Sequence, residues 1–383
     1  MNLPAHRLHL PELDALRGLA SVTVLIDHYS LIFRTSDGVF APVGRWLMWA
    51  QTTPLYVLFA GHESVVLFFL LSGFVLSLPY LANQAAPDRA FLLRRVCRIY
   101  LPYLPALLFA LVCARTVYRG PIHDLSPWFN KTWAHGIQGS LVLDHLTFLG
   151  SFNSSAFDPV LWSLVVELRV SLLFPWLARL WIRLGRRQNS SFVLAAMLIG
   201  QVASTAMTKF QIDFDYFLTI TAIGVFLAGF LLAQNIRAIE GWYRSQSTTG
   251  RIGFACVGFL LYAYAKDLPG RWLYFEDIPI MLGASMMTIT AICSRRTGSF
   301  LRHRVPQFFG RISYSLYLYH AIVLLAVFHT LYGTLPVVVL ILLAMATTVL
   351  LSQISYTFVE LPSISLGRRL SRAHQGGVLQ QPQ

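Results

Sequence analysis

The first long apolar segment of the chain carries charged residues that a membrane-spanning helix rarely keeps. It reads LDALRGLASVTVLIDH over residues 13–28. At about 3.6 residues per turn, Asp14, Arg17 and His28 fall on one face of a helix, with Arg17 and His28 roughly 16 Å apart along its axis. An ionisable group at the centre of a membrane helix costs at least ~2.5–3.5 kcal/mol, so such groups are usually retained for a function. The segment therefore predicts a polar stripe for charge and proton chemistry within an apolar helix.

Composition places the chain among polytopic membrane proteins. Hydrophobic residues make up 56% of its 383 positions and charged residues 12%, whereas soluble domains carry about 25% charged residues. Long apolar runs predict an all-α bundle of about ten transmembrane helices. The predicted helices lie near residues 15–33, 62–82, 100–118, 160–182, 191–208, 216–235, 252–266, 277–293, 311–331 and 336–356.

The chain is expected to hold one transmembrane domain over residues 1–363, followed by a polar, loose cytoplasmic tail over residues 364–383. Pro362 is expected to end the last helix, because proline cannot donate a backbone hydrogen bond. No cleavable signal peptide is expected, since Pro4, Pro11 and polar groups occupy the start of the chain. No separate soluble domain is expected either.

The net charge of +13 is distributed in a way that argues against nucleic acid as a partner. Arginines gather in alternate connections, those after the second, fourth, sixth, eighth and tenth predicted helices. The positive-inside rule then places both termini in the cytoplasm. The cysteines show neither the spacing of metal ligands nor a disulfide framework, so no metal site is expected. They are Cys97, Cys113, Cys256 and Cys293.

His28 is a candidate general base, because a neutral imidazole can accept a proton near neutral pH. A histidine that merely hydrogen-bonds a neighbouring helix is the structural alternative. Asp27 points about 100° away from His28 around the helix, and its role stays open. Glu167, with Ser163 one turn before it, is a second intramembrane candidate. Its carboxylate could position His28, balance its charge or accept hydrogen bonds from a sugar.

A group of arginines follows the second predicted helix at residues 94, 95 and 98. Guanidinium groups bind phosphates with two parallel hydrogen bonds, so Arg94, Arg95 and Arg98 are candidates for holding a phosphorylated ligand. The alternative is an anchor that contacts anionic lipid headgroups of the membrane.

Tyr317 and His320 share a face of the ninth predicted helix with Ser313. These side chains could line a polar cavity, or they could only form hydrogen bonds between helices. The residue pattern leaves both interpretations open.

Taken in order, these blocks resemble the acyltransferase-3 family of integral-membrane O-acyltransferases. The resemblance covers nearly the whole chain, and its motifs are specific jointly rather than singly. They are LDxLRG at 13–18 with Arg17 and His28, FFxxSGF at 68–74, LWSLxVE at 161–167, and ISYSLYLxH at 312–320 with the later VELP at 359–362.

The resemblance implies a protein that moves an acyl group, commonly acetyl, from a cytoplasmic acyl-coenzyme A. The implied acceptor is a carbohydrate hydroxyl on the outer face of the inner membrane of a bacterium. Arg17 and His28 match the family's essential arginine and histidine. The arginine-rich motif that is assigned to the coenzyme A phosphates corresponds here to Arg94, Arg95 and Arg98.

Glu167 matches the first acid of the family's Val-Glu-Glu pattern, while Leu168 replaces the second acid. Any role that needs the second carboxylate is therefore in doubt for this chain. The remaining polar candidates are expected to contact the acceptor. They are Asp14, Ser163, Tyr317 and His320.

Two other classes of function fit parts of the pattern. A proton-coupled transporter of small molecules would use Asp27, His28 and Glu167 as a relay, and would move solute without an acyl donor. A catalytically idle sensor or assembly partner would tolerate the loss of His28. The sequence leaves open the identity of the acceptor, the size of the acyl group, and whether transfer is direct or passes through an acyl-histidine.

Overall fold

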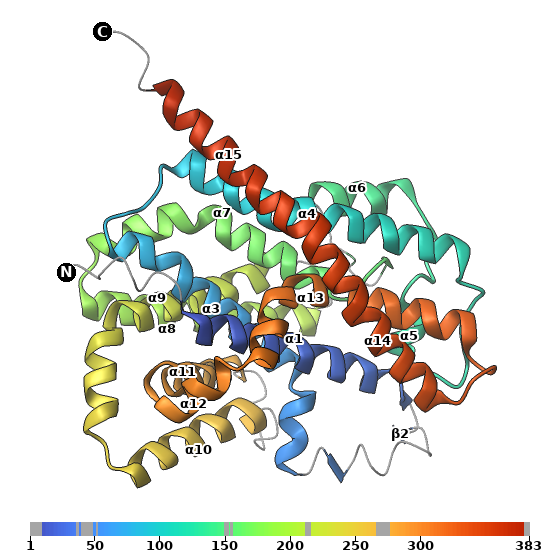
Figure 1. The fold of residues 1–383 in the computed structure, drawn as a ribbon, viewed down its shortest axis with the longest axis horizontal. Helices are drawn as coiled ribbons and strands as arrows, with labels where there is room; N and C mark the ends of the chain where they lie inside the picture. The colour runs from blue at the N-terminus through green and yellow to red at the C-terminus, as the bar shows by residue number, and fades with distance from the viewer. Residues whose placement is uncertain are drawn as a thin grey trace. The chain divides into compact units, whose positions relative to one another are not determined.

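The computed structural model describes residues 10–35, 38–39, 49–50, 53–148, 153, 156–210, 216–265 and 276–378 (Figure 1). These residues are helical almost throughout, which confirms the expected all-α class of a polytopic membrane protein. The two short strands β1 (Arg34–Thr35) and β2 (Gly38–Val39) form one antiparallel pair, with Arg34 opposite Val39.

The helices of the described residues are named here in chain order. In the first part of the chain they are α1 (Pro11–Leu31), η2 (Pro54–Phe59), α3 (Gly61–Leu81), α4 (Asp88–Thr116), α5 (Pro127–Lys131), α6 (Gly139–Thr147) and α7 (Leu161–Arg183). The later ones are α8 (Arg186–Phe210), α9 (Tyr216–Ser245), α10 (Thr248–Tyr264), α11 (Asp277–Cys293), α12 (Arg295–Leu301), α13 (Arg304–Leu331), α14 (Val337–Ser355), η6 (Tyr356–Glu360) and α15 (Leu361–Val378).

Each predicted membrane segment overlaps one of these helices. Six helices of the described chain are long and apolar enough to cross a membrane, and the pair α11 and α12, bent by 90°, would add a seventh. α1 fails this test of composition because Asp14, Arg17 and Asp27 fall within it. A count of about ten spans therefore stays a prediction.

The end of the chain differs from the sequence-based expectation. Helix α14 does not stop at Pro362 but continues through the π-helical turn η6 into α15, which runs to Val378. A proline ring would collide with the carbonyl group four residues earlier in a regular α-helix. The wider π turn just before it relieves that collision. Most of the segment expected to be loose is thus helical, and residues 379–383 lie outside the described part.

Small residues fix α15 against α4, which lies beside it (Figure 1). Ser363, Gly367 and Ser371 are buried and recur every four residues along one face of α15. A Cβ atom added to Gly367 would lie 2.9 Å from Cβ of Cys97 and 3.3 Å from Cα of Arg94. The expectation of a loose tail missed this close approach, because serine and glycine are also typical of polar linkers.

The described chain packs as two compact units, each built from three segments. The first unit comprises Met1–Ala20, His62–Pro87 and Arg169–Arg311, and the second comprises Ser21–Gly61, Asp88–Leu168 and Ile312–Gln383. Helices α1, α3, α7 and α13 contribute residues to both units.

Glycines set the helix spacing inside the first unit. A Cβ atom on Gly73 of α3 would lie 1.9 Å from the carbonyl oxygen of Phe226 in α9, and one on Gly229 would lie 2.1 Å from that of Leu70. The small residues of the FFxxSGF block thus allow α3 and α9 to touch through their backbones, as its sequence predicts.

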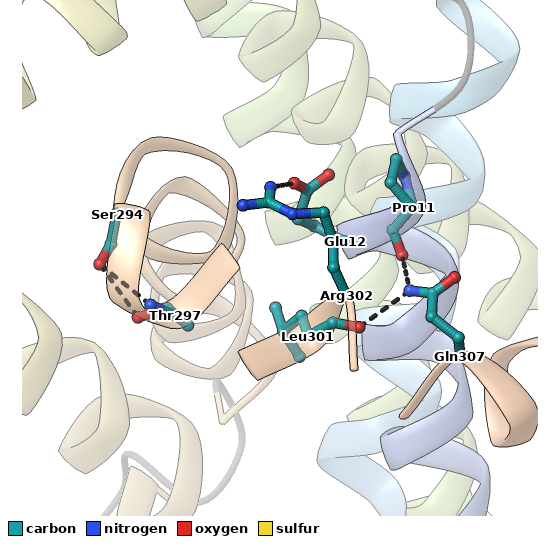
Figure 2. A network of polar contacts seen from close by, with 7 residues as sticks. All are labelled: Pro11, Glu12, Ser294, Thr297, Leu301, Arg302 and Gln307. Carbon is teal, nitrogen blue, oxygen red and sulfur yellow. Dashed lines mark hydrogen bonds and ion pairs between the residues drawn. The ribbon is translucent and has the colours of Figure 1, made fainter. Parts of the chain in front are cut away.

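A polar network in the same unit holds the beginning of α1 (Figure 2). Glu12 forms an ion pair with Arg302, and the amide of Gln307 donates to the carbonyl oxygens of Pro11 and Leu301, each at 2.8 Å. Nearly two turns further along α1, a Cβ on Gly18 would lie 2.3 Å from the backbone nitrogen of Gly310. The first turns of α1 are therefore fixed by backbone contacts as well as by charge.

The α3–α9 contact predicts an asymmetry between two glycine substitutions. Gly73→Ala should lower stability by about 1–3 kcal/mol or more, because a methyl group cannot fit beside a carbonyl oxygen without separating the helices. Gly241→Ala, at an exposed position of α9 with nothing within 4 Å, should be neutral or stabilising by up to ~1 kcal/mol. Thermal unfolding in detergent measures both. Equal stability of the two variants would contradict the packing described here.

Candidate functional site

Two histidines of the second unit form a direct hydrogen bond. Nδ1 of His28 in α1 lies 2.7 Å from Nε2 of His320 in α13, and the planes of the two rings differ by only 5°. His320 is fully buried, whereas His28 is partly exposed. His28, the candidate base, is thus held at one nitrogen by a second imidazole of the same unit.

The ring of Trp128 packs on His28 with a centroid separation of 5.2 Å and an interplanar angle of 21°. Trp128 comes from α5, a short helix capped by the hydroxyl of Ser126. The backbone N–H of Ser126 donates to the carbonyl oxygen of Ile32 at 2.9 Å, which ties α5 to the end of α1. No local signal could have indicated the contact, since it depends on how the long connection folds back.

Ser163 and Tyr317 also come together. Their hydroxyl oxygens are 2.6 Å apart, and Ser163 donates to the carbonyl oxygen of Val160 at 3.1 Å. The Tyr317 ring also contacts the His320 ring edge to face at 5.8 Å. Three of the residues expected to contact the acceptor, Ser163, Tyr317 and His320, are therefore neighbours.

Glu167 lies beside an arginine rather than in hydrogen-bond contact with His28. Its Oε1 is 3.3 Å from a terminal nitrogen of Arg95, whose side chain is 11% exposed. The sequence analysis had placed these two residues in different roles, one near the base and one on the donor phosphates. A charged pair at low exposure is stabilised by mutual neutralisation, and removing one partner would leave the other as an uncompensated charge.

Arg94 and Arg98 keep positions one turn apart on α4. Nε of Arg94 donates to the carbonyl oxygen of Ala90 at 3.1 Å, and Arg98 is exposed. Nearby, Ser315 donates to Glu360 at 2.9 Å. Binding of an anionic ligand by Arg94 and Arg98 stays a prediction.

Asp14 and Arg17 belong to the first unit. Arg17 lies 3.6 Å from Asp14, with side-chain exposures of 17% and 36%. A further acid of α1, Asp27, packs in the second unit against the backbone of Gly61, the first residue of α3. A carboxylate is favoured at a helix N-terminus, because the backbone N–H groups there carry partial positive charge. This placement gives Asp27 a structural explanation that the sequence left open.

Asp158 is a buried acid just before α7. It is fully inaccessible, its Oδ1 accepts from the N–H of Val160 at 3.3 Å, and its Oδ2 has no hydrogen-bond partner among the described residues. Burial raises the pKa of Asp158 well above its usual value, although the hydrogen bond from Val160 acts in the opposite direction. The neutral acid is the form that fits this environment.

Comparisons with known proteins place these residues in a family. A family model described as an acyltransferase domain matches residues 10–357. The O-acetyltransferase OatA of Staphylococcus aureus (strain NCTC 8325 / PS 47) is 24% identical over 388 aligned residues, which cover 92% of this chain and 57% of that protein. A Bacillus subtilis (strain 168) protein provisionally named peptidoglycan O-acetyltransferase YrhL is 24% identical, with 95% and 56% covered.

Nodulation protein 10 of Rhizobium leguminosarum bv. viciae is 25% identical, and the alignment covers 95% of this chain and 97% of that protein. The chain thus spans slightly more than half the length of the Staphylococcus and Bacillus relatives, and nearly all of the Rhizobium one. No solved structure matches the chain significantly.

Burial of Asp158 predicts how stability changes with pH. A folded-state pKa above the unfolded value means that folding binds a proton, so this contribution is present at low pH and is lost as pH rises above the unfolded pKa. Asp158→Asn cannot ionise and should be less sensitive to pH. Its melting temperature should therefore exceed that of the wild type by a margin that grows between pH 5 and pH 8, measured by thermal unfolding in detergent.

The control for this measurement is Asp144→Asn, at a partly exposed position of α6. Its melting temperature should follow that of the wild type at every pH. A wild-type protein that gains stability over Asp158→Asn as the pH rises would mean that Asp158 is folded as a carboxylate with a partner.

Proposed function

Because the chain belongs to the acyltransferase-3 family, whose domain model matches residues 10–357, we propose that it is an integral-membrane O-acyltransferase. The group transferred is an acyl group, in the first instance acetyl, and the acceptor is a hydroxyl of a carbohydrate. The names of relatives as O-acetyltransferases, one of them of peptidoglycan, support this choice of donor group and acceptor. Since those relatives are considerably longer than this chain, the choice rests on the shared domain alone.

His28 is the proposed general base. It takes the proton of the acceptor hydroxyl, and the resulting alkoxide attacks the thioester carbonyl carbon of the donor. The new ester forms as the carbon–sulfur bond breaks, and the thiolate of coenzyme A receives the proton from the imidazolium. A base of this kind contributes typically 10²–10⁴-fold to the rate. Direct transfer needs no covalent enzyme intermediate, although an acyl-histidine is a chemically possible variant.

Arg94 and Arg98 are the proposed contacts for the phosphates of a cytoplasmic acyl-coenzyme A. Their support is their spacing on one face of α4 and the exposure of Arg98, since guanidinium groups match phosphate geometry. Arg95 pairs with Glu167, so we assign these two a joint role in holding α4 and α7 together at the site. Arg17 remains a proposed donor-binding residue, as the family resemblance implies, and Asp14, which lies beside it, remains a proposed contact for the acceptor.

Ser163 and Tyr317 are the proposed contacts for the acceptor. Their hydroxyl groups can both donate and accept hydrogen bonds, as sugar hydroxyls do. The arginine-rich alternate connections support an orientation with both termini in the cytoplasm and the acceptor on the opposite face. The bacterial sources of the relatives support the inner membrane of a bacterium as the location.

The observation that carries the proposal is the position of His28 inside the family match, with one ring nitrogen hydrogen-bonded and the ring partly exposed. A proton-coupled transporter would need a relay between Asp27, His28 and Glu167. In the second unit each of these three lies against a different neighbour, namely Gly61, His320 and Arg95.

Substitution of the base tests the reaction directly. His28→Ala should lower acyl transfer by about 100-fold or more while the protein still inserts into the membrane. The measurement compares envelope glycans by mass spectrometry from a deletion strain carrying the wild type or the variant, looking for a lost acyl increment. Wild-type glycan acylation by this variant would refute the proposed function, and donor-independent solute flux would favour the transporter.

Substitution of the arginines tests donor binding. Arg94→Gln combined with Arg98→Gln should raise the KM for acetyl-coenzyme A by about 10-fold or more, because charge-assisted hydrogen bonds contribute about 1.5–3 kcal/mol each. Transfer from labelled acetyl-coenzyme A in membrane vesicles measures this. Arg119→Gln, at an exposed position of the connection after α4, is the control and should leave the KM unchanged. An unchanged KM in the double variant would remove these arginines from the donor site.

A further inference from the structure

We propose that His320 is a positioning residue that determines which nitrogen of His28 acts as the base. The inference rests on the proposed function, in which His28 takes the proton of the acceptor. The sequence pattern left open whether His320 contacts the acceptor or only forms hydrogen bonds between helices. In the structure the ring of His320 instead contacts His28 through one nitrogen and its own helix backbone through the other.

The backbone of α13 fixes the tautomer of His320. Nδ1 of His320 lies 2.8 Å from the carbonyl oxygen of Tyr317 and 3.2 Å from that of Leu316. Carbonyl oxygens only accept hydrogen bonds, so Nδ1 must carry the proton. A neutral imidazole has one protonated nitrogen, and Nε2 of His320 is therefore an acceptor.

This acceptor fixes the tautomer of His28 in turn. Nε2 of His320 is 2.7 Å from Nδ1 of His28, a distance at which one of the two nitrogens must donate. Since Nε2 of His320 is the acceptor, Nδ1 of His28 carries the proton. The lone pair of His28 is then on Nε2. This nitrogen has no hydrogen-bond partner among the described residues and is the atom left to take the proton of the acceptor hydroxyl.

Packing holds the pair in this geometry. His320 is fully buried and the two rings are nearly parallel, while Trp128 packs on His28. The titratable groups that touch the pair in the described chain are two tyrosines. The hydroxyl of Tyr29 lies 3.5 Å from the carbonyl oxygen of His320, and the ring of Tyr317 meets the His320 ring edge to face. No described carboxylate hydrogen-bonds either imidazole.

The chain of hydrogen bonds has a chemical consequence during the reaction. When Nε2 of His28 takes a proton, its ring becomes a cation and the bond from Nδ1–H to His320 becomes charge-assisted. His320 stabilises that cation without itself gaining a proton. An aspartate performs this service for a catalytic histidine in soluble hydrolases. A neutral imidazole does so within the membrane without the desolvation cost of a buried carboxylate.

Two substitutions of His320 separate positioning from packing. In His320→Gln the side-chain amide oxygen can reach the place of Nε2 and accept from His28, whereas His320→Leu fills space but accepts nothing. Acetyl transfer from labelled acetyl-coenzyme A to endogenous glycan in membrane vesicles should fall about 100-fold or more in the leucine variant. The glutamine variant should recover at least about a tenth of the wild-type rate, and the KM for acetyl-coenzyme A should be unchanged in both.

The pH profile gives a readout that a purely structural role would leave unchanged. Without the hydrogen-bond acceptor at His320, the imidazolium form of His28 is less favourable. The acidic limb of the plot of transfer rate against pH should therefore move to lower pH. The shift should be about one pH unit or more in His320→Leu and smaller in His320→Gln. His329→Gln, a histidine of the same helix outside the pair, is the matched control and should keep the wild-type profile.

Nitrogen NMR of histidine-labelled protein tests the tautomer without relying on activity. At neutral pH the signals that vanish in His28→Ala should report a protonated Nδ1 and an unprotonated Nε2. The opposite tautomer would overturn the inference, as would wild-type rates and pH profiles in both His320 variants. Those results would leave the acyltransferase proposal intact if His28→Ala is inactive, whereas an active His28→Ala would defeat the proposed function itself.

Discussion

In a lipid environment, water cannot satisfy a polar side chain, so every buried polar group must find its partner within the protein. This constraint explains the second unit as a set of pairs: His28 with His320, Ser163 with Tyr317, Arg95 with Glu167, and Ser315 with Glu360. Three of these pairs, those that include His320, Tyr317 and Ser315, join α13 to a helix that is distant in the sequence. The residues that carry the proposed chemistry are therefore also those that hold the helices in register.

Backbone contacts at glycines also hold the helices together. Helices in lipid gain little from burying apolar surface against each other, so close packing and hydrogen bonds must stabilise the bundle. Gly73 and Gly229 bring α3 and α9 together, and Gly18 and Gly310 bring α1 and α13 together within the first unit. Side chains on such rigid helices keep their positions more exactly than side chains on loops. This suits a site in which the ring of His28 must keep the orientation that leaves Nε2 as the base.

The sequence predicted the helical class, the family and the identity of the polar residues, because hydropathy and motifs are local properties. The family and the class are confirmed. The sequence did not show which polar residues meet. It left several roles open for Glu167, and neither the ion pair of Glu167 with Arg95 nor the contact of Trp128 with His28 had a local signal. Pairing depends on how distant helices cross, and periodicity within one helix carries no information about that. The π turn before Pro362 was missed for a different reason, since a rule about proline in α-helices was applied to a helix that changes its pitch.

The continuation of α14 into α15 affects how the limits of this protein should be drawn. The match to the family model ends at residue 357, inside the π turn, while the helix itself runs on to Val378. The part beyond that match packs on α4, where Gly367 lies against Cys97 and the backbone of Arg94. A domain boundary placed at the end of that match would divide one continuous helix and expose the surface of α4 on which α15 packs. Truncated proteins designed on that boundary would therefore represent the native protein poorly.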